Sequence, residues 1–289
     1  MRPLLYNAPS DLRAFLEEQG LGLRKRFGQN FLINPEARTR LIDALGAGPG
    51  DEVWEIGPGL GAMTGELLDR GVSVQAFEID PGFIRILKTF FGGNSRFSLI
   101  EGDVLKTWRT AKPAGYLLGN LPYRIGARLL GDLIEGGRNF TRLVVMVQRE
   151  VGQRIIARPG SPEYSSFSVM CASAYRVRPL MVLKGGAFYP VPHVDSQGLQ
   201  FDFYANPREY PPGFYELVRR SFGSRRKTLK NNLRGWDYAE AGMRLCGIAP
   251  DRRAETLELS DFIALASALE KARLGPAAEK AGRISFQGN

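Results

Sequence analysis

The sequence has very little histidine and cysteine, and this scarcity limits the metal and nucleophile chemistry that it can support. His193 is the only histidine, and the two cysteines, Cys171 and Cys246, lie far apart without Cys-x-x-Cys spacing. A zinc site built from histidine and cysteine ligands is therefore excluded. A Ser-His-Asp triad would have to use His193, and no nucleophile elbow surrounds that residue. We expect two reduced, buried thiols and no metal.

Long apolar runs are also missing. No stretch approaches the roughly 20 apolar residues of a membrane-spanning helix. The segment "MRPLLYNAPSDLRAF" has neither the apolar core nor the cleavage site of a signal peptide. We therefore expect a cytoplasmic protein that does not enter a membrane. With 289 residues and 44% hydrophobic composition, the chain can bury one sizeable core, or one core and a smaller second domain.

Acidic residues are outnumbered by basic ones, 30 to 39, which gives a formal net charge of +9. Such an excess favours a polyanionic partner, either a nucleic acid or an anionic membrane surface. The charge is concentrated in "LRKRF" (23–27) and in "VRRSFGSRRKTLKNNLR" (218–234), which holds seven basic residues and no acidic one. We expect the second segment to form a basic helix face. That face could bind RNA or simply be solvated.

Hydrophobic patterning alternates between helices and short strands. Helices are predicted at 10–20 and 34–46, where Ser10 and Asn34 are the expected N-caps and Pro35 takes the first helical position. Strands are predicted at 51–57, 73–80, 97–103, 114–120 and 142–148. This alternation indicates an α/β fold with a parallel sheet.

Near residue 205, three prolines in "YANPREYPPG" interrupt the pattern. We predict a domain boundary there, between an α/β domain at 1–205 and a small, basic, helical domain at 206–289 with a loose tail.

A glycine-rich turn follows the first of these strands. "EIGPGLGAMT" (55–64) places Gly57, Gly59 and Gly61 between a strand and a helix, where the backbone can turn sharply and approach a ligand closely. Glu78 ends the next strand, 21 residues after Gly57, where a carboxylate can accept hydrogen bonds from ribose hydroxyls. A dinucleotide fingerprint would put its third glycine at Ala62, so this pattern supports a nicotinamide cofactor weakly. S-adenosylmethionine needs the same features without phosphate contacts.

Two further polar residues end the next strands. Asp103 ends the third strand and Asn120 the fourth, so both should lie with the glycine turn at the carboxyl edge of the sheet, where open α/β sheets bind ligands. Asp103 could instead cap a turn. Asn120 begins the stretch "NLPY", in which Pro122 stiffens the turn and Tyr123 offers a flat ring. A planar ligand that carries an amino group would suit these residues.

With these motifs in place, the sequence resembles the KsgA family of ribosomal RNA adenine dimethyltransferases. The resemblance rests on the blocks "KRFGQNFL", "EIGPGLGAMT", "GNLPY", "QREVGQRIIARPGSPEYSSFSVM", "GAFYPVPHVDS" and "RRKTLKNNL". It implies a Rossmann-like, S-adenosylmethionine-dependent methyltransferase domain and a small C-terminal helical domain. It also implies N6-dimethylation of two adjacent adenosines near the 3′ end of small-subunit (16S) ribosomal RNA during subunit biogenesis.

The resemblance also assigns site residues. For the cofactor it implies Asn30, Leu32, Gly57, Gly59, Glu78, Asp103 and Asn120. For the target adenine it implies Asn120, Leu121, Pro122, Tyr123 and Phe188. The basic segments add Arg24, Lys25, Arg26, Arg225, Arg226, Lys227 and Lys230 as RNA contacts.

The expected chemistry uses two hydrogen-bond acceptors for the amine and aromatic rings for the base. The Asn120 side-chain oxygen and the Leu121 carbonyl would accept hydrogen bonds from the adenine amine, whose lone pair is otherwise delocalised into the ring. Tyr123 would stack on the base. Phe188 would be a second aromatic face, although it could instead pack a turn. Arg124 and His193 depart from the family, in which asparagine and lysine are usual, and this affects the detail of RNA recognition.

Three other interpretations stay open at this point. The Erm-type resistance methyltransferases share the chemistry but modify large-subunit RNA. A ribosome-assembly factor could bind immature subunits with catalysis as a secondary role, and a mitochondrial transcription factor descends from the same family. We expect a monomer that acts on small-subunit ribosomal RNA within an immature ribosomal subunit.

Overall fold

The computed structural model of the protein describes residues 4–22, 29–206, 209–236 and 238–284, with side chains as far as Arg273. The chain forms two compact units. The first consists of residues 1–156 and 175–205, and the second of residues 157–174 and 206–289. The sequence-based boundary at 205/206 coincides with the second passage between the units. Residues 157–174, which that boundary placed in the first domain, group with the second unit because Tyr164, Val169 and Met170 lie in its core.

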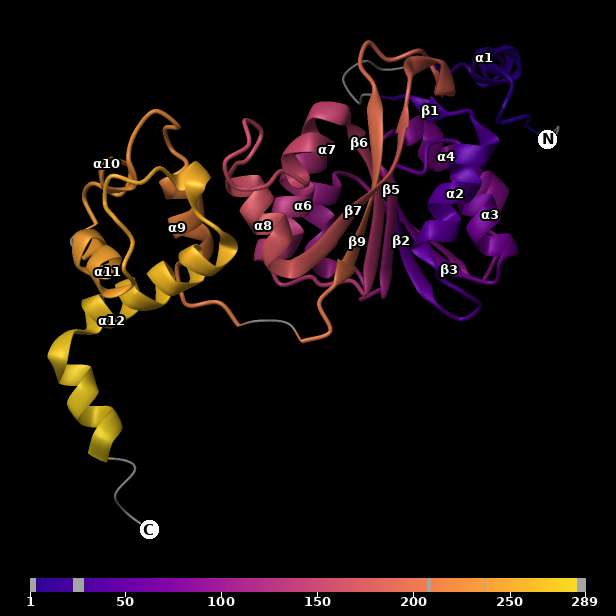
Figure 1. The fold of residues 1–289 in the computed structure, drawn as a ribbon. Helices are drawn as coiled ribbons and strands as arrows, with labels where there is room; N and C mark the ends of the chain where they lie inside the picture. The colour runs from indigo at the N-terminus through magenta and orange to yellow at the C-terminus, as the bar shows by residue number, and fades with distance from the viewer. Residues whose placement is uncertain (1–3, 23–28, 207–208, 237, 285–289) are drawn as a thin grey trace. The chain divides into compact units, whose positions relative to one another are not determined.

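The first unit is built on a seven-stranded sheet with the order β4-β3-β2-β5-β6-β9-β7 (Figure 1). Its strands are β2 (Glu52–Ile56), β3 (Ser73–Glu78), β4 (Phe97–Glu101), β5 (Tyr116–Asn120), β6 (Arg142–Gln148), β7 (Tyr175–Leu183) and β9 (Ser196–Phe203). Its helices are α1 (Pro9–Glu18), α2 (Pro35–Leu45), α3 (Ala62–Asp69), α4 (Pro81–Phe91), α5 (Val104–Thr107), α6 (Gly126–Glu135) and α7 (Arg149–Ile155), with the 3-10 turns η2 (Trp108–Thr110) and η3 (Gly185–Ala187). A short antiparallel pair joins β1 (Phe31–Leu32) to β8 (Phe188–Tyr189).

The strand order creates a switch point between β2 and β5. From β2 the chain winds to β3 and β4 on one side, and then returns to add β5 and β6 on the other side, all four pairings being parallel. β9 and β7 complete the sheet in antiparallel orientation. The predicted α/β fold with a mostly parallel sheet is confirmed. Loops that leave the carboxyl ends of β2 and β5 diverge, which opens a crevice for a ligand.

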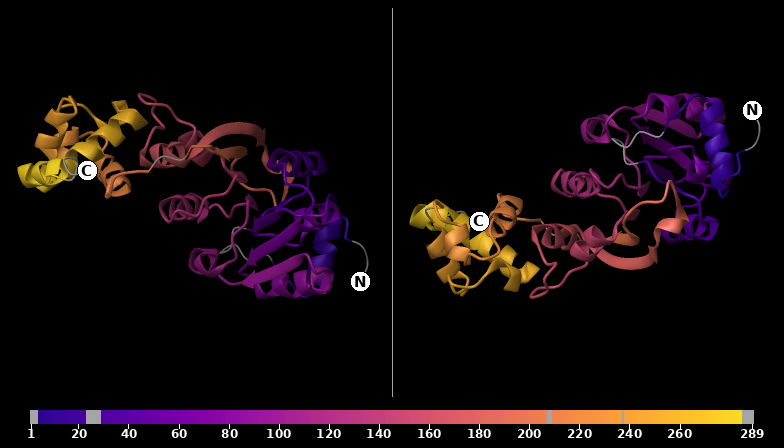
Figure 2. Two further views of the ribbon diagram at one scale, coloured as in Figure 1. Left: turned by 90° about the horizontal axis from the view of Figure 1, so that it is seen from below. Right: turned by 90° about the horizontal axis from the view of Figure 1, so that it is seen from above.

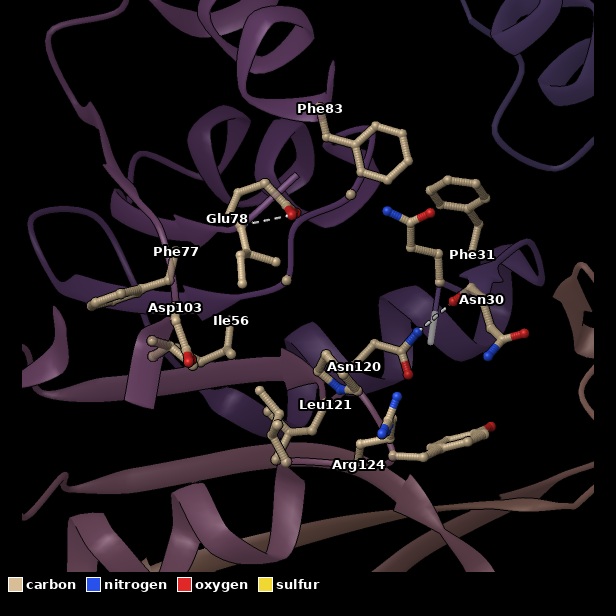
Figure 3. A pocket seen from close by; sticks show the side chains of 18 of the residues that line it. Asn30, Phe31, Ile56, Phe77, Glu78, Phe83, Asp103, Asn120, Leu121 and Arg124 are labelled. Carbon is tan, nitrogen blue, oxygen red and sulfur yellow. Dashed lines mark hydrogen bonds between the residues drawn. The ribbon is translucent and has the colours of Figure 1, made fainter. Parts of the chain in front are cut away.

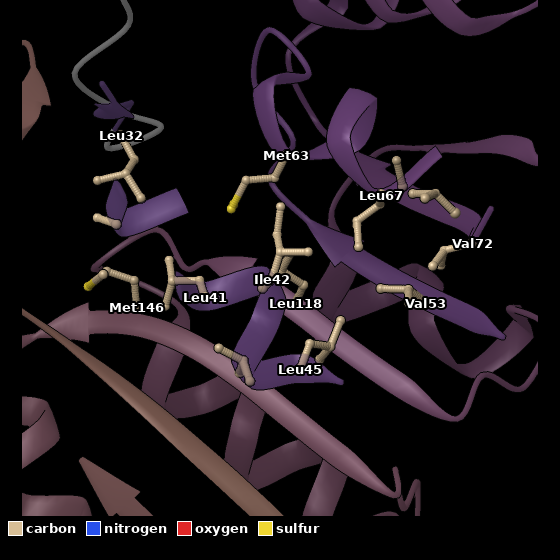
Figure 4. Packing of buried hydrophobic residues seen from close by; sticks show 14 of the residues in the cluster. Leu32, Leu41, Ile42, Leu45, Val53, Met63, Leu67, Val72, Leu118 and Met146 are labelled. Carbon is tan, nitrogen blue, oxygen red and sulfur yellow. The ribbon is translucent and has the colours of Figure 1, made fainter. Parts of the chain in front are cut away.

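Helices on both faces keep the strand ends in place. On one face, α2 and α3 bury Leu41, Leu45 and Leu67 against Val53 of β2 and Leu118 of β5 (Figure 4). Because side chains alternate along a strand, Trp54 points to the opposite face. There its ring lies 4.8 Å from that of Phe77 and 5.2 Å from that of Phe140. Figure 1 shows α2 and α3 on one side of the sheet and α6 on the other, and Figure 2 gives two further views.

The second unit is helical. It contains α8 (Ser166–Ala174), α9 (Phe214–Ser221), α10 (Leu229–Asn232), α11 (Ala239–Leu245), the 3-10 turn η4 (Ala254–Thr256) and α12 (Leu259–Ile284). The basic segment 218–234 does not form the single helix face that its composition suggested. α9 ends at Ser221, and α10 begins only after Thr228, whose side chain accepts a hydrogen bond from the Asn231 amide as the N-cap. Three basic residues therefore lie on the turn, Lys230 lies on the short helix after it, and Arg234 follows that helix, so the charges do not share one long face.

Within the described ranges, no helix has the length and apolar character needed to cross a membrane.

Candidate functional site

A pocket of about 460 Å³ opens at the switch point between β2 and β5 (Figure 3). It collects residues from the ends of β2, β3, β4 and β5 and from the segment before β1. Of the site residues predicted from the sequence, the structure brings together Asn30, Gly57, Gly59, Glu78, Asp103, Asn120, Leu121, Pro122 and Tyr123.

The glycine turn forms one wall of this pocket. Gly57 and Gly59 adopt left-handed backbone conformations, with φ of +67° and +59°. A Cβ atom at Gly59 would lie 3.0 Å from the Phe31 ring, which itself packs 5.6 Å from the Phe83 ring. A side chain at this position would therefore be strained and would crowd the aromatic pair beside the pocket.

Glu78 is a buried carboxylate at the end of β3. It is 7% exposed, and its Oε1 accepts hydrogen bonds from the Ile79 and Asp80 amides, each at 2.8 Å. Burial raises its pKa to about 7, although these hydrogen bonds favour the charged form. The neighbouring Asp80 caps α4 and accepts a hydrogen bond from Gln29 Nε2 at 2.9 Å. The pocket thus holds an acceptor whose charge changes near neutral pH.

A second buried carboxyl lies beside the same turn. Glu55 of β2 is fully buried, and its Oε2 accepts a 2.6 Å hydrogen bond from Thr64 Oγ1. Burial raises its pKa to about 7, and repulsion from Glu78 adds to the shift. The sequence analysis did not single out Glu55. A glutamate inside an apolar strand next to a glycine turn is a sequence signal for such a buried carboxyl group.

Asp103 both caps a helix and lines the pocket. Its Oδ1 accepts a hydrogen bond from the Leu105 amide at 3.0 Å, as the N-cap of α5. The Gly102 amide donates to the Glu78 carbonyl at 2.7 Å, which holds the ends of β3 and β4 together. Figure 3 shows Glu78 and Asp103 on one side of the pocket and Asn120 on the other. The two roles expected for Asp103, capping and facing the ligand, are therefore compatible.

Asn120 has a defined amide orientation. Its Nδ2 donates to the Asn30 carbonyl at 2.8 Å, and only the nitrogen of the amide can make this bond (Figure 3). Its Oδ1 accepts no hydrogen bond from any residue that the structure describes. Leu121 donates its own amide to the Met146 carbonyl at 3.0 Å, and its carbonyl likewise has no donor within the described chain. The turn after β5 thus offers two free acceptors.

Tyr123 and Arg124 complete this end of the pocket. The Tyr123 hydroxyl lies 2.7 Å from Ser196 Oγ, and burial raises the pKa of Tyr123. Arg124 is exposed and also lines the pocket. The Pro122 carbonyl accepts hydrogen bonds from the Ile125 and Gly126 amides, which joins the turn to the start of α6.

Other predicted residues are not in this pocket. Leu32 and Phe188 are paired between β1 and β8 and belong to the hydrophobic cluster beneath α2. Leu32 borders an adjacent cavity of about 50 Å³, whereas Phe188, which is 1% exposed, lines neither cavity. This buried position agrees with the alternative interpretation of Phe188, in which its ring packs a turn. The role of Phe188 as an aromatic face for the base stays a prediction, and its absence from the pocket lining does not support that role. His193 is exposed and lines neither cavity.

The predicted RNA contacts fall into three groups. Arg24, Lys25 and Arg26 lie outside the described residues. Arg225 donates to the carbonyls of Pro162 and Ser161 and lies 3.9 Å from Glu255. Lys230 pairs with Glu240 at 3.0 Å. Arg226 and Lys227 are exposed on the turn after α9, and neither forms an ion pair with a described residue.

Several lining residues were missed by sequence reasoning. Gln29, Phe31, Phe77 and Phe83 line the pocket, and the three phenylalanines add to the aromatic surface that Tyr123 provides. Gln29 and Phe31 flank the predicted Asn30 in the block "KRFGQNFL", Phe77 precedes Glu78 in β3, and Phe83 lies on α4. Among the residues for which the structure gives side chains, no cluster of three or more histidine, cysteine, aspartate or glutamate residues could hold a metal.

The doubly wound sheet with an antiparallel last pair, and the pocket at its switch point, are those of a Rossmann-like domain that binds a ligand at the carboxyl ends of its strands. The chain belongs to the ribosomal RNA adenine dimethylase family, whose model matches residues 20–271. The family and the enzyme class expected from the sequence are thereby confirmed.

Three comparisons illustrate this membership. The ribosomal RNA small subunit methyltransferase A of Treponema denticola is 41% identical over 281 residues, which cover 92% of this chain and 96% of that protein. A dimethyladenosine transferase from Plasmodium falciparum has a similar structure, with a TM-score of 0.70 at 24% identity, covering 83% of this chain and 97% of that chain. The 23S rRNA methyltransferase ErmE has a TM-score of 0.62 at 22% identity, covering 83% and 99%. The two structures show the fold.

Proposed function

We propose that this protein transfers methyl groups from S-adenosylmethionine to N6 of two adjacent adenosines near the 3′ end of small-subunit ribosomal RNA. The observation that carries the proposal is that Asn120 Oδ1 and the Leu121 carbonyl, at one end of the 460 Å³ pocket, accept no hydrogen bond from any residue that the structure describes. Relatives such as the Treponema denticola protein, which are named for the small subunit, favour this substrate over large-subunit RNA.

The pocket residues fit S-adenosylmethionine. Glu78 and Asp103 line the same pocket, where Glu78 would accept hydrogen bonds from ribose hydroxyls and Asp103 would face the adenine end. Gly57 and Gly59 leave no side chain between the turn and the ligand. When bound, this cofactor supplies the methyl group on a sulfonium centre that needs no metal.

At the other end, the chain's own residues would prepare the amine. Asn120 cannot rotate its amide without losing the bond to Asn30, so Oδ1 stays available for an N–H of the base. Accepting that hydrogen bond favours a localised lone pair on the amine. Because both acceptors are already oriented before the base binds, methyl transfer requires little free energy to reorganise them. We find no residue that must act as a general base, and the proton can leave to solvent after transfer.

We further infer a division of labour. The first unit would carry out the chemistry, and the basic turn of the second unit would contact RNA phosphates. A pocket of this kind takes an unstacked base, which favours looped or unpaired RNA in an immature ribosomal subunit. We expect the protein to act there as a cytoplasmic monomer.

Mass spectrometry of nuclease-digested ribosomal RNA, after incubation with isotope-labelled S-adenosylmethionine, tests the proposal. The expected product is labelled N6,N6-dimethyladenosine in small-subunit RNA from immature subunits. Label found only in large-subunit RNA, or no labelled adenosine, would overturn it.

The raised pKa of Glu78 predicts that cofactor affinity depends on pH. Glu78 is neutral below about pH 7 and charged above it, and ribose hydroxyls donate better to the charged form. Affinity should therefore fall as the pH falls, with a Kd on the order of tenfold weaker at pH 6 than at pH 8. Calorimetry with S-adenosylmethionine would measure this change. Glu78→Gln, which keeps the shape and leaves Glu55 to titrate, should show a weaker and nearly constant Kd. Equal wild-type affinity at both pH values would contradict the prediction.

A further inference from the structure

The Tyr123 hydroxyl has a buried partner on a distant strand. Ser196, the first residue of β9, is fully buried, and its Oγ lies 2.7 Å from the Tyr123 oxygen. Seventy-three positions separate the two residues in the sequence. This contact connects the turn that follows β5 to the antiparallel part of the sheet.

Ser196 is held firmly where three strands meet. It is paired with Gln148 at the end of β6 and with Leu183 at the end of β7. Because β9 runs antiparallel to β6, it begins at the edge where β6 ends, which is also the edge of the pocket. The preceding residue, Asp195, accepts a hydrogen bond from the Arg149 amide at 2.9 Å. The serine hydroxyl is therefore a fixed anchor rather than a mobile surface group.

The backbone of Tyr123 is fixed as well. Leu121 continues the sheet by donating to Met146, and Pro122 accepts two amides at the start of α6. With the backbone held by these bonds and the hydroxyl held by Ser196, the orientation of the ring is restricted at both ends. Without Ser196 the half-buried ring could still turn about its side-chain bonds.

We propose that Ser196 is a positioning residue that presets the plane of the Tyr123 ring for stacking on the target adenine. The proposal rests on the proposed function. A ring that is already oriented does not have to be ordered when the base arrives, so binding retains more of the stacking energy. Ser196 does not line the pocket that holds Asn120 and Leu121. The hydrogen bond between the two hydroxyls should therefore affect RNA binding more than the rate of methyl transfer.

A double-mutant cycle tests this coupling. Ser196→Ala and Tyr123→Phe remove the same hydrogen bond from opposite ends while they keep the ring. Each should raise KM for immature-subunit RNA by about 2- to 10-fold, the range of one net hydrogen bond, and leave kcat within about twofold. The double variant should have the KM of either single variant, because the second change removes nothing further. Effects on KM that multiply, or single variants with wild-type KM, would overturn the proposal.

A matched control separates positioning from general stability. Ser173 is another buried serine, whose hydroxyl donates to the Met170 carbonyl at 2.7 Å within the second unit. Ser173→Ala should lower thermal stability by an amount similar to Ser196→Ala and leave KM unchanged. If KM rises equally in both, the effect is structural and the proposal fails. A wild-type protein that methylates no small-subunit RNA would instead refute the proposed function.

Discussion

Asn120→Ala should lower kcat for RNA methylation by about 10²- to 10³-fold, the usual cost of losing one preorganised polar contact at a reacting centre. The variant loses Oδ1, which would accept from the adenine amine, and also the 2.8 Å bond from Nδ2 to the Asn30 carbonyl. Cofactor affinity should change much less, because Glu78 and Asp103 lie at the other end of the pocket (Figure 3). Single-turnover kinetics with saturating RNA would measure the chemical step, and calorimetry would measure cofactor binding.

Two further variants sharpen this test. Asn120→Asp keeps the shape but cannot donate to the Asn30 carbonyl, so its carboxylate should turn away from that oxygen and lose the preset orientation. Its kcat should also be low. Such a result would show that methyl transfer needs the anchored amide and not only an oxygen acceptor at this position. Asn34→Ala removes the N-cap of α2, where Oδ1 accepts from the Ala37 amide at 2.8 Å. This control should lower stability and leave kcat unchanged. If Asn120→Ala kept kcat within about threefold of wild type, our account of the turn after β5 would be wrong.

Local patterns in the sequence predicted the parallel half of the fold well. The five predicted strands correspond to β2 through β6, and Asn34 caps α2 as expected. Ser10 was wrong as a cap, because α1 begins at Pro9 after Ala8 and has no side-chain cap. The antiparallel strands β7 and β9 were missed. β7 includes Arg176, Arg178 and Pro179, so it reads as polar and interrupted, and only its pairing with β9 stabilises it as a strand.

The site shows the same division between local and distant contacts. Gly57, Glu78, Asp103 and Asn120 could be found because each lies at or just after the end of a strand that the pattern identified. Phe31 and Ser196 lie within the quoted blocks "KRFGQNFL" and "GAFYPVPHVDS", but their roles could not be predicted, since these depend on contacts with Gly59 and Tyr123 that form only after folding. Phe188 shows the converse, because a motif match alone did not reveal that its ring is buried in the core.

The structure also changes which basic residues should be tested for RNA binding. The sequence suggested Arg225, Arg226, Lys227 and Lys230 as one group. Arg225 binds two main-chain carbonyls and Lys230 pairs with Glu240, so both have structural contacts within the second unit. Arg226 and Lys227 have no ion pair with any residue described there, and both are exposed. These two side chains are therefore the free cations of the turn that we expect to reach phosphates.

Replacing Arg226 and Lys227 together by glutamine should weaken RNA binding and flatten its dependence on salt. Each phosphate contact contributes about 0.7–0.9 to the slope of log affinity against log salt, so removing both cations should lower that slope by about 1.4–1.8. At 0.1 M salt the same counterion term corresponds to a decrease of about 25- to 60-fold in affinity. Filter binding of small-subunit RNA across a salt series would measure both. Cofactor affinity should stay constant, since the pocket belongs to the first unit.

Arg225→Gln is the matched control for this double variant. It removes one positive charge from the same turn, together with bonds to the Pro162 and Ser161 carbonyls. Because this guanidinium is held by the protein, its removal should lower thermal stability and change the salt slope by less than one phosphate contact. A double variant with the wild-type slope would mean that Arg226 and Lys227 are only solvated. A larger slope change in Arg225→Gln than in the double variant would place the phosphate contact at Arg225, against our assignment.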